Sequence, residues 1–190
     1  MGKIVISENV SLDGVIQDPV GDEGFSRGGW VGRVGDRGRE AAAKVLLDEA
    51  LAAEAQLLGR RSYEFLAARW PDRSGELADR LNSMPKYVVS ATLADPEWHN
   101  TTVLSGDPVT EVRKLKRELS GRIAVAASFQ LVRALLEHDL VDEVRLMVYP
   151  VVLGAGERLF GETSGAKPMR LVTAETVGDL AHLIYTPAGS

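Results

Sequence analysis

A Gly-Arg-Arg-Ser run at residues 59–62 combines the groups that proteins use to bind phosphate. It follows a short apolar run and opens a helical pattern, so backbone N–H groups, a hydroxyl and two guanidinium groups lie together. Two adjacent arginines, Arg60 and Arg61, suit the dianionic 2′-phosphate that distinguishes NADPH from NADH. The same residues also fit an ordinary helix start with surface arginines, and spacing alone favours that alternative.

A second run, Ala126-Ala127-Ser128-Phe129-Gln130, also leads from an apolar segment into a helical one. Ser128 suits a diphosphate through its hydroxyl and the N-terminus of the helix. The alternative is that Ser128 is only the N-cap of that helix. Spacing alone favours the N-cap.

The run Ser11-Leu12-Asp13-Gly14 places a carboxylate where the first apolar segment ends. Such a carboxylate can hold the N–H groups of a heterocycle or help to protonate a ring nitrogen. Asp-Gly is also common in turns for steric reasons, so a turn residue is the alternative. Two aromatic residues of the next loop, Phe25 and Trp30, either stack on a planar ring or fold the loop onto the core.

Other chemistries find little support in the residue types. The three histidines, His99, His138 and His182, are scattered and lack partners at metal-ligand spacing, so we expect no metal site. There is no cysteine, which excludes disulfides, thiolate catalysis and zinc–thiolate sites. Gly154-Ala155-Gly156 lacks the third glycine of a dinucleotide fingerprint.

The composition is that of one ordinary globular domain over residues 1–190, with 45% hydrophobic and 26% charged residues. The net charge of −5 comes from acidic and basic residues mixed along the chain, which argues against a nucleic-acid partner. No apolar run approaches the ~20 residues of a membrane span. The chain opens on a strand-like segment, so we expect no signal peptide and a cytoplasmic location.

The hydrophobic pattern predicts an α/β fold in which strands and helices alternate through the first 150 residues. Pro85 marks a helix end, Asp107 a helix start, and Gly178-Asp179 the turn of a closing hairpin. A mainly parallel sheet with an antiparallel C-terminal edge follows from that order. The expected strands are 3–10, 55–58, 87–90, 101–104, 123–126, 144–152, 171–177 and 180–185; the expected helices are 39–54, 61–68, 75–83, one after Asp107, and 129–138; residues 17–38 form a loop.

Taken together, the segments resemble the dihydrofolate-reductase-like superfamily. They are most similar to stand-alone bacterial proteins that resemble the C-terminal reductase domain of the riboflavin-biosynthesis protein RibD. The similarity runs in order through nearly the whole chain. Its carriers are Ser11-Leu12-Asp13-Gly14, Leu57-Leu58-Gly59-Arg60-Arg61-Ser62-Tyr63-Glu64, Lys86-Tyr87-Val88-Val89-Ser90, the segment 131–143, and Pro150-Val151-Val152-Leu153-Gly154-Ala155-Gly156 with Arg158-Leu159-Phe160.

This resemblance implies a three-layer α/β/α fold with a mostly parallel central sheet, and an NADPH-dependent reductase in the form of a homodimer. Hydride would pass to a C=N or C=O bond of a small heterocycle, such as a pterin or a 5-amino-6-(5-phosphoribosylamino)uracil-like compound. Asp13 would be the catalytic group and would bind substrate with Trp30 and Pro150. The residues implied in NADPH binding are Gly59, Arg60, Arg61, Ser62, Ser90, Ser105, Ala127, Ser128, Phe129 and Gln130.

The chain also departs from the family pattern. The family's diphosphate turn usually carries glycine where this chain has Ala127, and a methyl group there narrows the approach of the phosphates. The glutamate that precedes that turn in the riboflavin-type reductase has no match, nor has the substrate-binding acid of true dihydrofolate reductases. A non-catalytic nucleotide- or heterocycle-binding module on the same fold is therefore the alternative function.

Overall fold

The computed structural model describes residues 1–189 and divides into two units. Unit 1 comprises Met1–Ile6 and Leu47–Asp142; unit 2 comprises Ser7–Leu46 and the C-terminal segment that starts at Glu143. Strand β1 (Lys3–Ser11) and helix α1 (Asp36–Ala52) run from one unit into the other. Hydrogen bonding orders the eight strands β4-β3-β2-β5-β1-β6-β8-β7.

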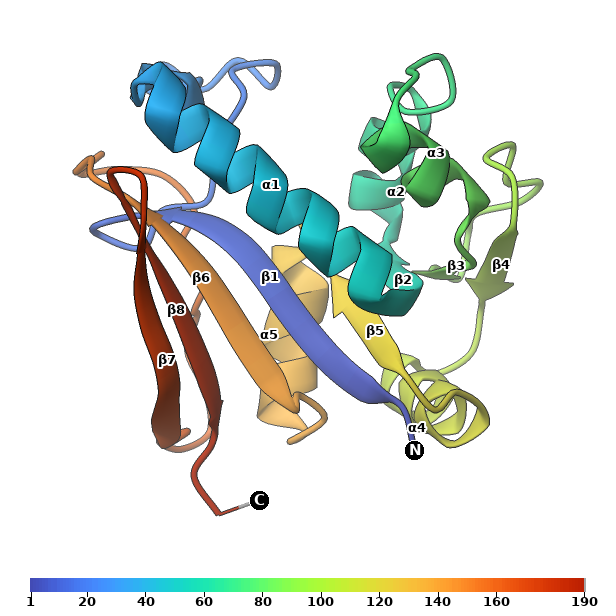
Figure 1. The fold of residues 1–190 in the computed structure, drawn as a ribbon. Coiled ribbons are helices and arrows are strands. Elements are labelled where there is room, and N and C mark those ends of the chain that lie inside the picture. Colours follow the sequence, from blue (N-terminus) through green and yellow to red (C-terminus); the bar gives the residue numbers. More distant parts are fainter. Residues whose placement is uncertain (190) are drawn as a thin grey trace. The chain divides into compact units, whose positions relative to one another are not determined.

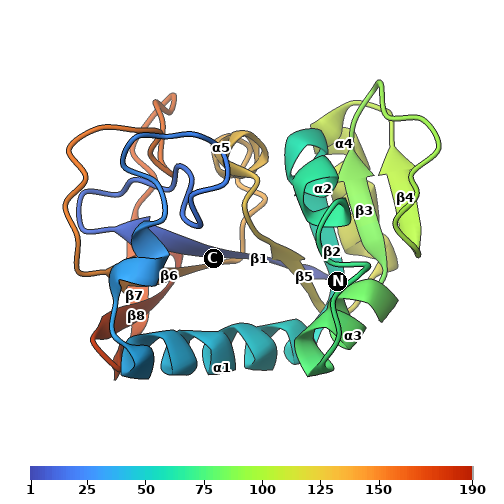
Figure 2. The same cartoon turned by 90° about the horizontal axis from the view of Figure 1, so that it is seen from above.

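Unit 1 is built on parallel strands that alternate with helices. Every strand pair described here, β1 with β5, β2 with β5, β2 with β3 and β3 with β4, is parallel. Helix α2 packs on β2 and β3 (Figure 2). Helix α5 packs on β2. The elements are β2 (Ala53–Gly59), α2 (Arg60–Ala67), α3 (Glu76–Ser83), β3 (Lys86–Val89), β4 (Thr101–Leu104), α4 (Pro108–Glu118), β5 (Arg122–Val125) and α5 (Phe129–Glu137).

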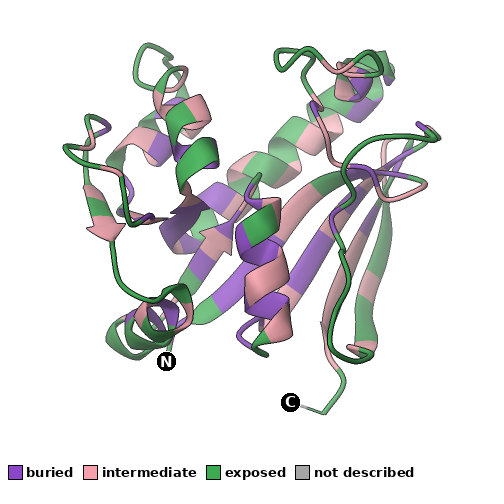
Figure 3. Cartoon of the chain, turned by 180° about the vertical axis from the view of Figure 1, so that it is seen from behind, coloured by how far each residue is buried: buried purple, intermediate pink, exposed green. Residues whose placement is uncertain are grey.

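Two helices of unit 1 show how the sequence sets their boundaries and their buried faces. In α4, the Asp107 side chain accepts a hydrogen bond from the Thr110 N–H at 2.9 Å, and Pro108 occupies the first turn. In α5, four apolar residues are buried against the sheet, while the opposite side is more exposed (Figure 3). These four are Leu131, Val132, Leu135 and Leu136.

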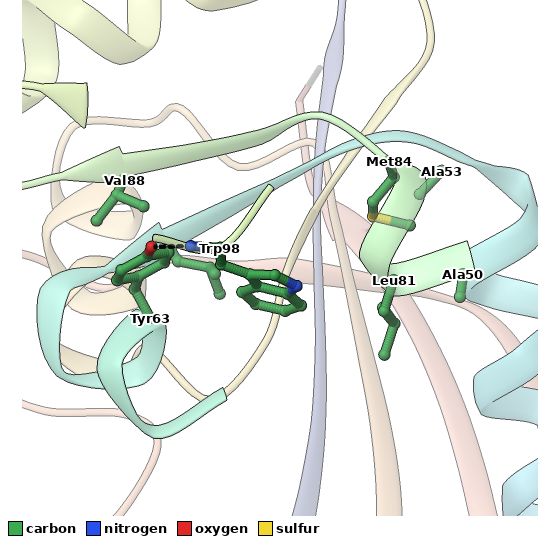
Figure 4. Packing of buried hydrophobic residues seen from close by; sticks show 8 residues of the cluster. Ala50, Ala53, Tyr63, Leu81, Met84, Val88 and Trp98 are labelled. Carbon is green, nitrogen blue, oxygen red and sulfur yellow. Dashed lines mark hydrogen bonds between the residues drawn. The ribbon is translucent and has the colours of Figure 1, made fainter. Parts of the chain in front are cut away.

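An aromatic core cluster fills the space between α2, α3 and β3. Tyr63 and Trp98 lie with ring centroids 6.2 Å apart, and the Tyr63 hydroxyl accepts a hydrogen bond from the backbone N–H of Trp98 (Figure 4). Met84, Leu81 and Val88 pack in the same cluster. Because all are nearly fully buried, this cluster fixes α2 and α3 on the strands that they cover.

Unit 2 carries the antiparallel part of the sheet (Figure 1). Strands β6 (Glu143–Tyr149), β7 (Met169–Val177) and β8 (Leu180–Pro187) pair antiparallel, with β8 between the other two. The short helix η1 (Trp30–Arg33) precedes α1. The turn at Gly178 has a φ of 63° and lies against Gly38, where a Cβ atom would come within 2.8 Å of backbone. Position 178 therefore requires glycine for two reasons, its positive φ and its close approach to the backbone at Gly38.

The predicted fold class is confirmed: the sheet is mostly parallel and ends in a C-terminal antiparallel hairpin. Most boundaries differ from the predicted ones by one or two residues, and two differ by three. Helix α1 begins at Asp36, inside the segment expected as a loop, and its last predicted residues belong to β2. Strand β6 ends at Tyr149 rather than at residue 152, because Pro150 has no N–H with which to continue the ladder. The expected single domain over 1–190 stays a prediction. No helix among residues 1–189 is long and apolar enough to cross a membrane.

Candidate functional site

The carboxyl ends of four neighbouring parallel strands of unit 1 carry all the residues expected to bind a nucleotide. Strands β4, β3, β2 and β5 are adjacent, and Gly59 pairs with Val89, which pairs with Leu104. The turns that follow these strands therefore share one edge. They contain Gly59 to Ser62, Ser90, Ser105, and Ala127 to Gln130.

Hydrogen bonds between side chain and backbone join two of these turns to each other. The Ser128 hydroxyl accepts a bond from the Gly59 N–H at 3.0 Å and donates one to the Ala126 carbonyl at 3.1 Å. The Ser62 hydroxyl donates to the Ala127 carbonyl at 2.6 Å. Both hydroxyls are buried, so they hold the turns together rather than facing a ligand.

Ser128 occupies the predicted N-cap position of α5, but it does not cap the helix with its side chain. Ser128 precedes the helix, but its side chain makes no capping bond because the hydroxyl is committed to Gly59 and Ala126. The sequence could not reveal this, since the partner Gly59 lies 69 residues away along the chain.

Helices α2 and α5 begin at this edge without a side-chain cap. The first N–H groups of a helix have no acceptor within the helix, and the helix dipole adds partial positive charge there. These groups belong to Arg60, Arg61 and Ser62 in α2, and to Phe129 and Gln130 in α5. Two such N-termini on joined turns suit a ligand with more than one phosphate group.

The two arginines at the start of α2 differ in availability. The Arg60 guanidinium contacts Glu64 through a 2.7 Å ion pair and also donates to the Thr92 hydroxyl. Arg61 is exposed and has no hydrogen-bond or ion-pair partner among the described residues. Arg61 is therefore the guanidinium free to meet a phosphate.

Ser90 and Ser105 lie in the turns after β3 and β4. Ser90 is buried, and its hydroxyl accepts hydrogen bonds from the N–H groups of Thr92 and Leu93 at 3.3 and 3.0 Å. Ser105 is exposed. Ser90 thus shapes its turn, while Ser105 presents its side chain at the surface of the same edge.

Ala127 has a left-handed backbone conformation, with a φ of 56°. A residue with a Cβ atom pays roughly 1–2 kcal/mol to adopt that region, where glycine pays almost nothing. The residue that departs from the family pattern is thus held in the conformation that glycine would adopt freely. The bonds from Ser62 and from Ser128 surround Ala127 and hold this conformation.

Replacing Ala127 with glycine is expected to raise the free energy of unfolding by up to about 1 kcal/mol, because relief of strain outweighs the added entropy of the unfolded chain. The matched control is Ala126→Gly, since Ala126 has no positive φ and should lose about 0.5–1 kcal/mol. Urea denaturation of both variants measures the difference. Equal destabilisation of the two would show that Ala127 is unstrained.

In unit 2, the Asp13 carboxylate binds the chain segment that follows β6. Its oxygens accept hydrogen bonds from the Ser11 hydroxyl at 2.7 Å, the Leu153 N–H at 3.0 Å and the Gly154 N–H at 2.8 Å. These bonds, the Ser11 bond first, lower the pKa of Asp13 from 3.8 to about 2. Asp13 is therefore ionised near neutral pH and is a poor proton donor there.

Replacing Asp13 with asparagine is expected to cost about 1–2 kcal/mol of unfolding free energy, because the new amide N–H group faces donors instead of accepting from them. In the wild type the stabilisation is present above the unfolded-state pKa of 3.8 and is lost as the pH falls towards about 2. Chemical denaturation at neutral pH and near pH 3 measures both effects. Asp72→Asn, at an exposed position, is the control and should be neutral; equal stability of the two variants would contradict the anchoring role.

The loop after Asp13 is organised by a residue that sequence analysis did not single out. Asp18 is buried, and its carboxylate accepts hydrogen bonds from the N–H groups of Glu23 and Phe25, both at 3.0 Å. At Gly28 a Cβ atom would lie 2.4 Å from the same carboxylate. The density of Gly and Asp in this loop was the available signal, but it does not identify which aspartate lies inside.

Trp30 is fully buried rather than exposed to a ligand. Its indole N–H donates to the Gln17 carbonyl at 2.9 Å, and its ring packs edge-on against Tyr149 with centroids 5.3 Å apart. This is the alternative in which the aromatic residue folds the loop onto the core. Trp30 and Pro150 nevertheless both line a cavity of about 290 Å³ in unit 2.

Comparison with protein families shows which known proteins this chain is related to. The model of the RibD C-terminal domain matches residues 2–183, almost the entire chain. The chain belongs to this family. Among its relatives are two uncharacterized proteins of Bacillus subtilis (strain 168). YyaP is 30% identical over 136 residues, which are 68% of this chain and 71% of YyaP; YwjB is 26% identical over 132 residues, 70% and 72% respectively.

Solved structures show the same fold as this RibD C-terminal domain protein. A candidate riboflavin biosynthesis protein from Shewanella sp. PV-4 superposes with a TM-score of 0.77 at 21% identity, over 98% of this chain and 99% of that one. A pyrimidine reductase-like protein from Corynebacterium diphtheriae gives 0.62 at 14% identity, over 99% and 92%. Dihydrofolate reductase from Enterococcus faecalis, complexed with NADP(H), gives 0.57 at 12% identity, over 97% and 96%. The predicted dihydrofolate-reductase-like fold is thereby confirmed.

Proposed function

We propose that this protein is an NADPH-dependent reductase of a small heterocyclic compound. The observation that carries the proposal is the joined pair of turns in unit 1, where two uncapped helix N-termini and the unpartnered Arg61 lie at one sheet edge. The donor set suits the three phosphate groups of NADPH. Membership of a family named for the RibD reductase domain supports the same conclusion.

In this proposal the turns of unit 1 bind different parts of the nucleotide. Arg61 and the start of α2 bind the 2′-phosphate, and the start of α5 around Phe129 and Gln130 binds the diphosphate. Ser62 and Ser128 position the two turns, while Ser90 and Ser105 line the adenosine side. NADPH, when bound, supplies the hydride.

Unit 2 supplies the substrate contacts in the same proposal. Asp13 stays ionised and keeps the segment at Leu153 and Gly154 in place, and its carboxylate attracts N–H groups of the heterocycle. Because the Asp13 carboxyl group has already lost its proton near neutral pH, the proton comes from water or from another group. Pterins and 5-amino-6-(5-phosphoribosylamino)uracil-like pyrimidines are the substrates to test first.

Titration of the purified protein with NADPH and NADH, followed by nicotinamide fluorescence, tests this function. Micromolar NADPH binding with much weaker NADH binding is expected, followed by NADPH oxidation that depends on one of the candidate substrates. Binding of neither nucleotide would overturn the cofactor assignment.

One observation favours a second function, a binding module without turnover. The methyl group of Ala127 sits at the diphosphate turn in a strained conformation, where glycine would leave more room. Such a module would be stabilised by a heterocycle and would never oxidise NADPH.

We also propose that the protein forms a homodimer through the hairpin of unit 2. Strand β7 ends the strand order, and Leu171 and Val172 on it are half exposed, at 50% and 52%. An edge strand with exposed apolar side chains favours pairing with a second copy. Light scattering on the wild type and on a Val172→Lys variant measures the oligomeric state.

A further inference from the structure

The cavity of unit 2 lies where the carboxyl end of β6, the end of η1 and the β7–β8 turn meet. Its volume of about 290 Å³ lies just below the range of about 300–1,000 Å³ that is usual for small-molecule sites. Apolar groups of Val34, Pro150 and Val151 form much of its lining. The remaining lining residues include Tyr149, Arg33 and Asp179.

Tyr149 is a buried polar residue of the cavity, and its hydroxyl lacks a partner among the described residues. Its side chain is 4% exposed, yet its hydroxyl makes no hydrogen bond with any described residue. The Tyr149 hydroxyl oxygen is not among the solvent-excluded atoms of residues 1–189 that lack a hydrogen bond, so it keeps contact with open space. A buried phenol normally finds a hydrogen-bond partner.

The surroundings of Tyr149 hold its ring in one orientation. Trp30 packs edge-on against it at an interplanar angle of 81°, and the Trp30 indole is itself held by the Gln17 carbonyl. Burial raises the pKa of the Tyr149 hydroxyl above 10, so the group carries its proton at neutral pH and can donate it in a hydrogen bond.

The charges at the cavity indicate a ligand without net charge. Arg33 and Asp179 are both exposed and contribute one positive and one negative charge to the lining. Their fields oppose each other, so neither an anion nor a cation is favoured strongly. The apolar walls favour a flat ring over a flexible polar chain.

We propose that this cavity binds the uncharged, planar ring of a small heterocycle, with the Tyr149 hydroxyl donating a hydrogen bond to a carbonyl oxygen or ring nitrogen of that ring. Asp13 does not line this cavity, so the contact with Tyr149 is additional to the one proposed for Asp13. The inference rests on the proposed function only in taking the ring to be part of the substrate.

The test uses lumazine, a planar bicyclic dione, and indole, which has a similar ring size and no acceptor. Titration is followed by ¹H–¹⁵N NMR at neutral pH, with shift changes expected at Gly35, Val151 and Asp179. Tyr149→Phe keeps the ring and removes only the hydroxyl. It is expected to weaken lumazine binding about 5- to 10-fold, the loss of one neutral hydrogen bond, and to leave indole binding unchanged.

A second pair of variants guards against indirect effects on the fold. Val151→Phe fills the cavity and should abolish binding of both compounds, whereas Val152→Phe changes a neighbouring side chain that is 68% exposed and lies outside the cavity lining. Unchanged lumazine affinity in Tyr149→Phe, or no saturable binding to the wild type up to about 1 mM, would overturn the inference.

The outcome for NADPH separates this inference from the proposed function. Tyr149→Phe should bind NADPH as the wild type does, because the nucleotide groups belong to unit 1. Lumazine binding that depends on Tyr149 in a protein that fails to bind NADPH would leave the cavity assignment standing and remove the reductase.

Discussion

Replacing Arg61 with alanine is expected to weaken NADPH binding about 10- to 100-fold and to leave NADH binding nearly unchanged. The factor corresponds to the loss of one charge-assisted hydrogen bond, roughly 1.5–3 kcal/mol, to a group that only NADPH carries. Arg61 is exposed and unpartnered among the described residues, so its removal should not disturb the fold. Fluorescence titration with both nucleotides gives the two affinities.

Arg60→Ala is the matched control for this experiment. The Arg60 guanidinium contacts both Glu64 and Thr92, and it would have to leave these partners to bind a phosphate. Replacing Arg60 with alanine should therefore weaken NADPH binding only a few-fold. An equal loss of NADPH and NADH affinity in Arg61→Ala would remove the 2′-phosphate assignment. A larger effect at Arg60 than at Arg61 would exchange their roles.

The sequence predicts the elements well because local and tertiary preferences agree over most of the chain. Asp107 followed by Pro108 predicts the start of α4, and the apolar stripe from Leu131 to Leu136 predicts α5. Both helices are confirmed. The errors fall where tertiary contacts decide. Helix α1 begins earlier than its apolar pattern suggests, since Gly38 in its first turn fits against the β7–β8 turn.

The candidate site was predictable in residue type but not in hydrogen bonding. Parallel strand order brings the turns after β2 and β5 to the same edge, as the pattern of strands and helices implies. Which groups remain free for a ligand depends on contacts between residues distant in sequence. The bond between Ser128 and Gly59, the anchoring of Leu153 by Asp13 and the difference between Arg60 and Arg61 all depend on such contacts.

Lys86 shows the same limit most clearly, because the sequence places it only at the start of an apolar strand. In the structure it is fully buried, and its ammonium group donates to the carbonyls of Asn82, Met84 and His99 at 3.1, 2.9 and 3.0 Å. The same group lies 4.5 Å from the centre of the Trp98 ring. One side chain thus satisfies three carbonyls around the aromatic core cluster of unit 1.

Replacing Lys86 with methionine is expected to lower the free energy of unfolding by about 3–5 kcal/mol. Methionine has a similar volume but no donor, so three carbonyls lose their partner in a buried setting. Lys114→Met is the control, since the Lys114 side chain is 62% exposed beside Glu118 and should change stability by less than about 0.5 kcal/mol. Urea denaturation at neutral pH measures both variants.

The pH dependence separates a lost ammonium group from a simple packing defect. Burial, and to a smaller extent the nearby Arg80, lowers the pKa of Lys86 from 10.5 to about 8 in the folded protein. Between these two values the unfolded chain binds more protons, so this group makes the wild type more stable as the pH rises from about 8 to 10.5. Lys86→Met should lack that rise, while Lys114→Met should keep it. A rise of equal size in all three proteins would mean that Lys86 is charged to the same extent in the folded and unfolded states.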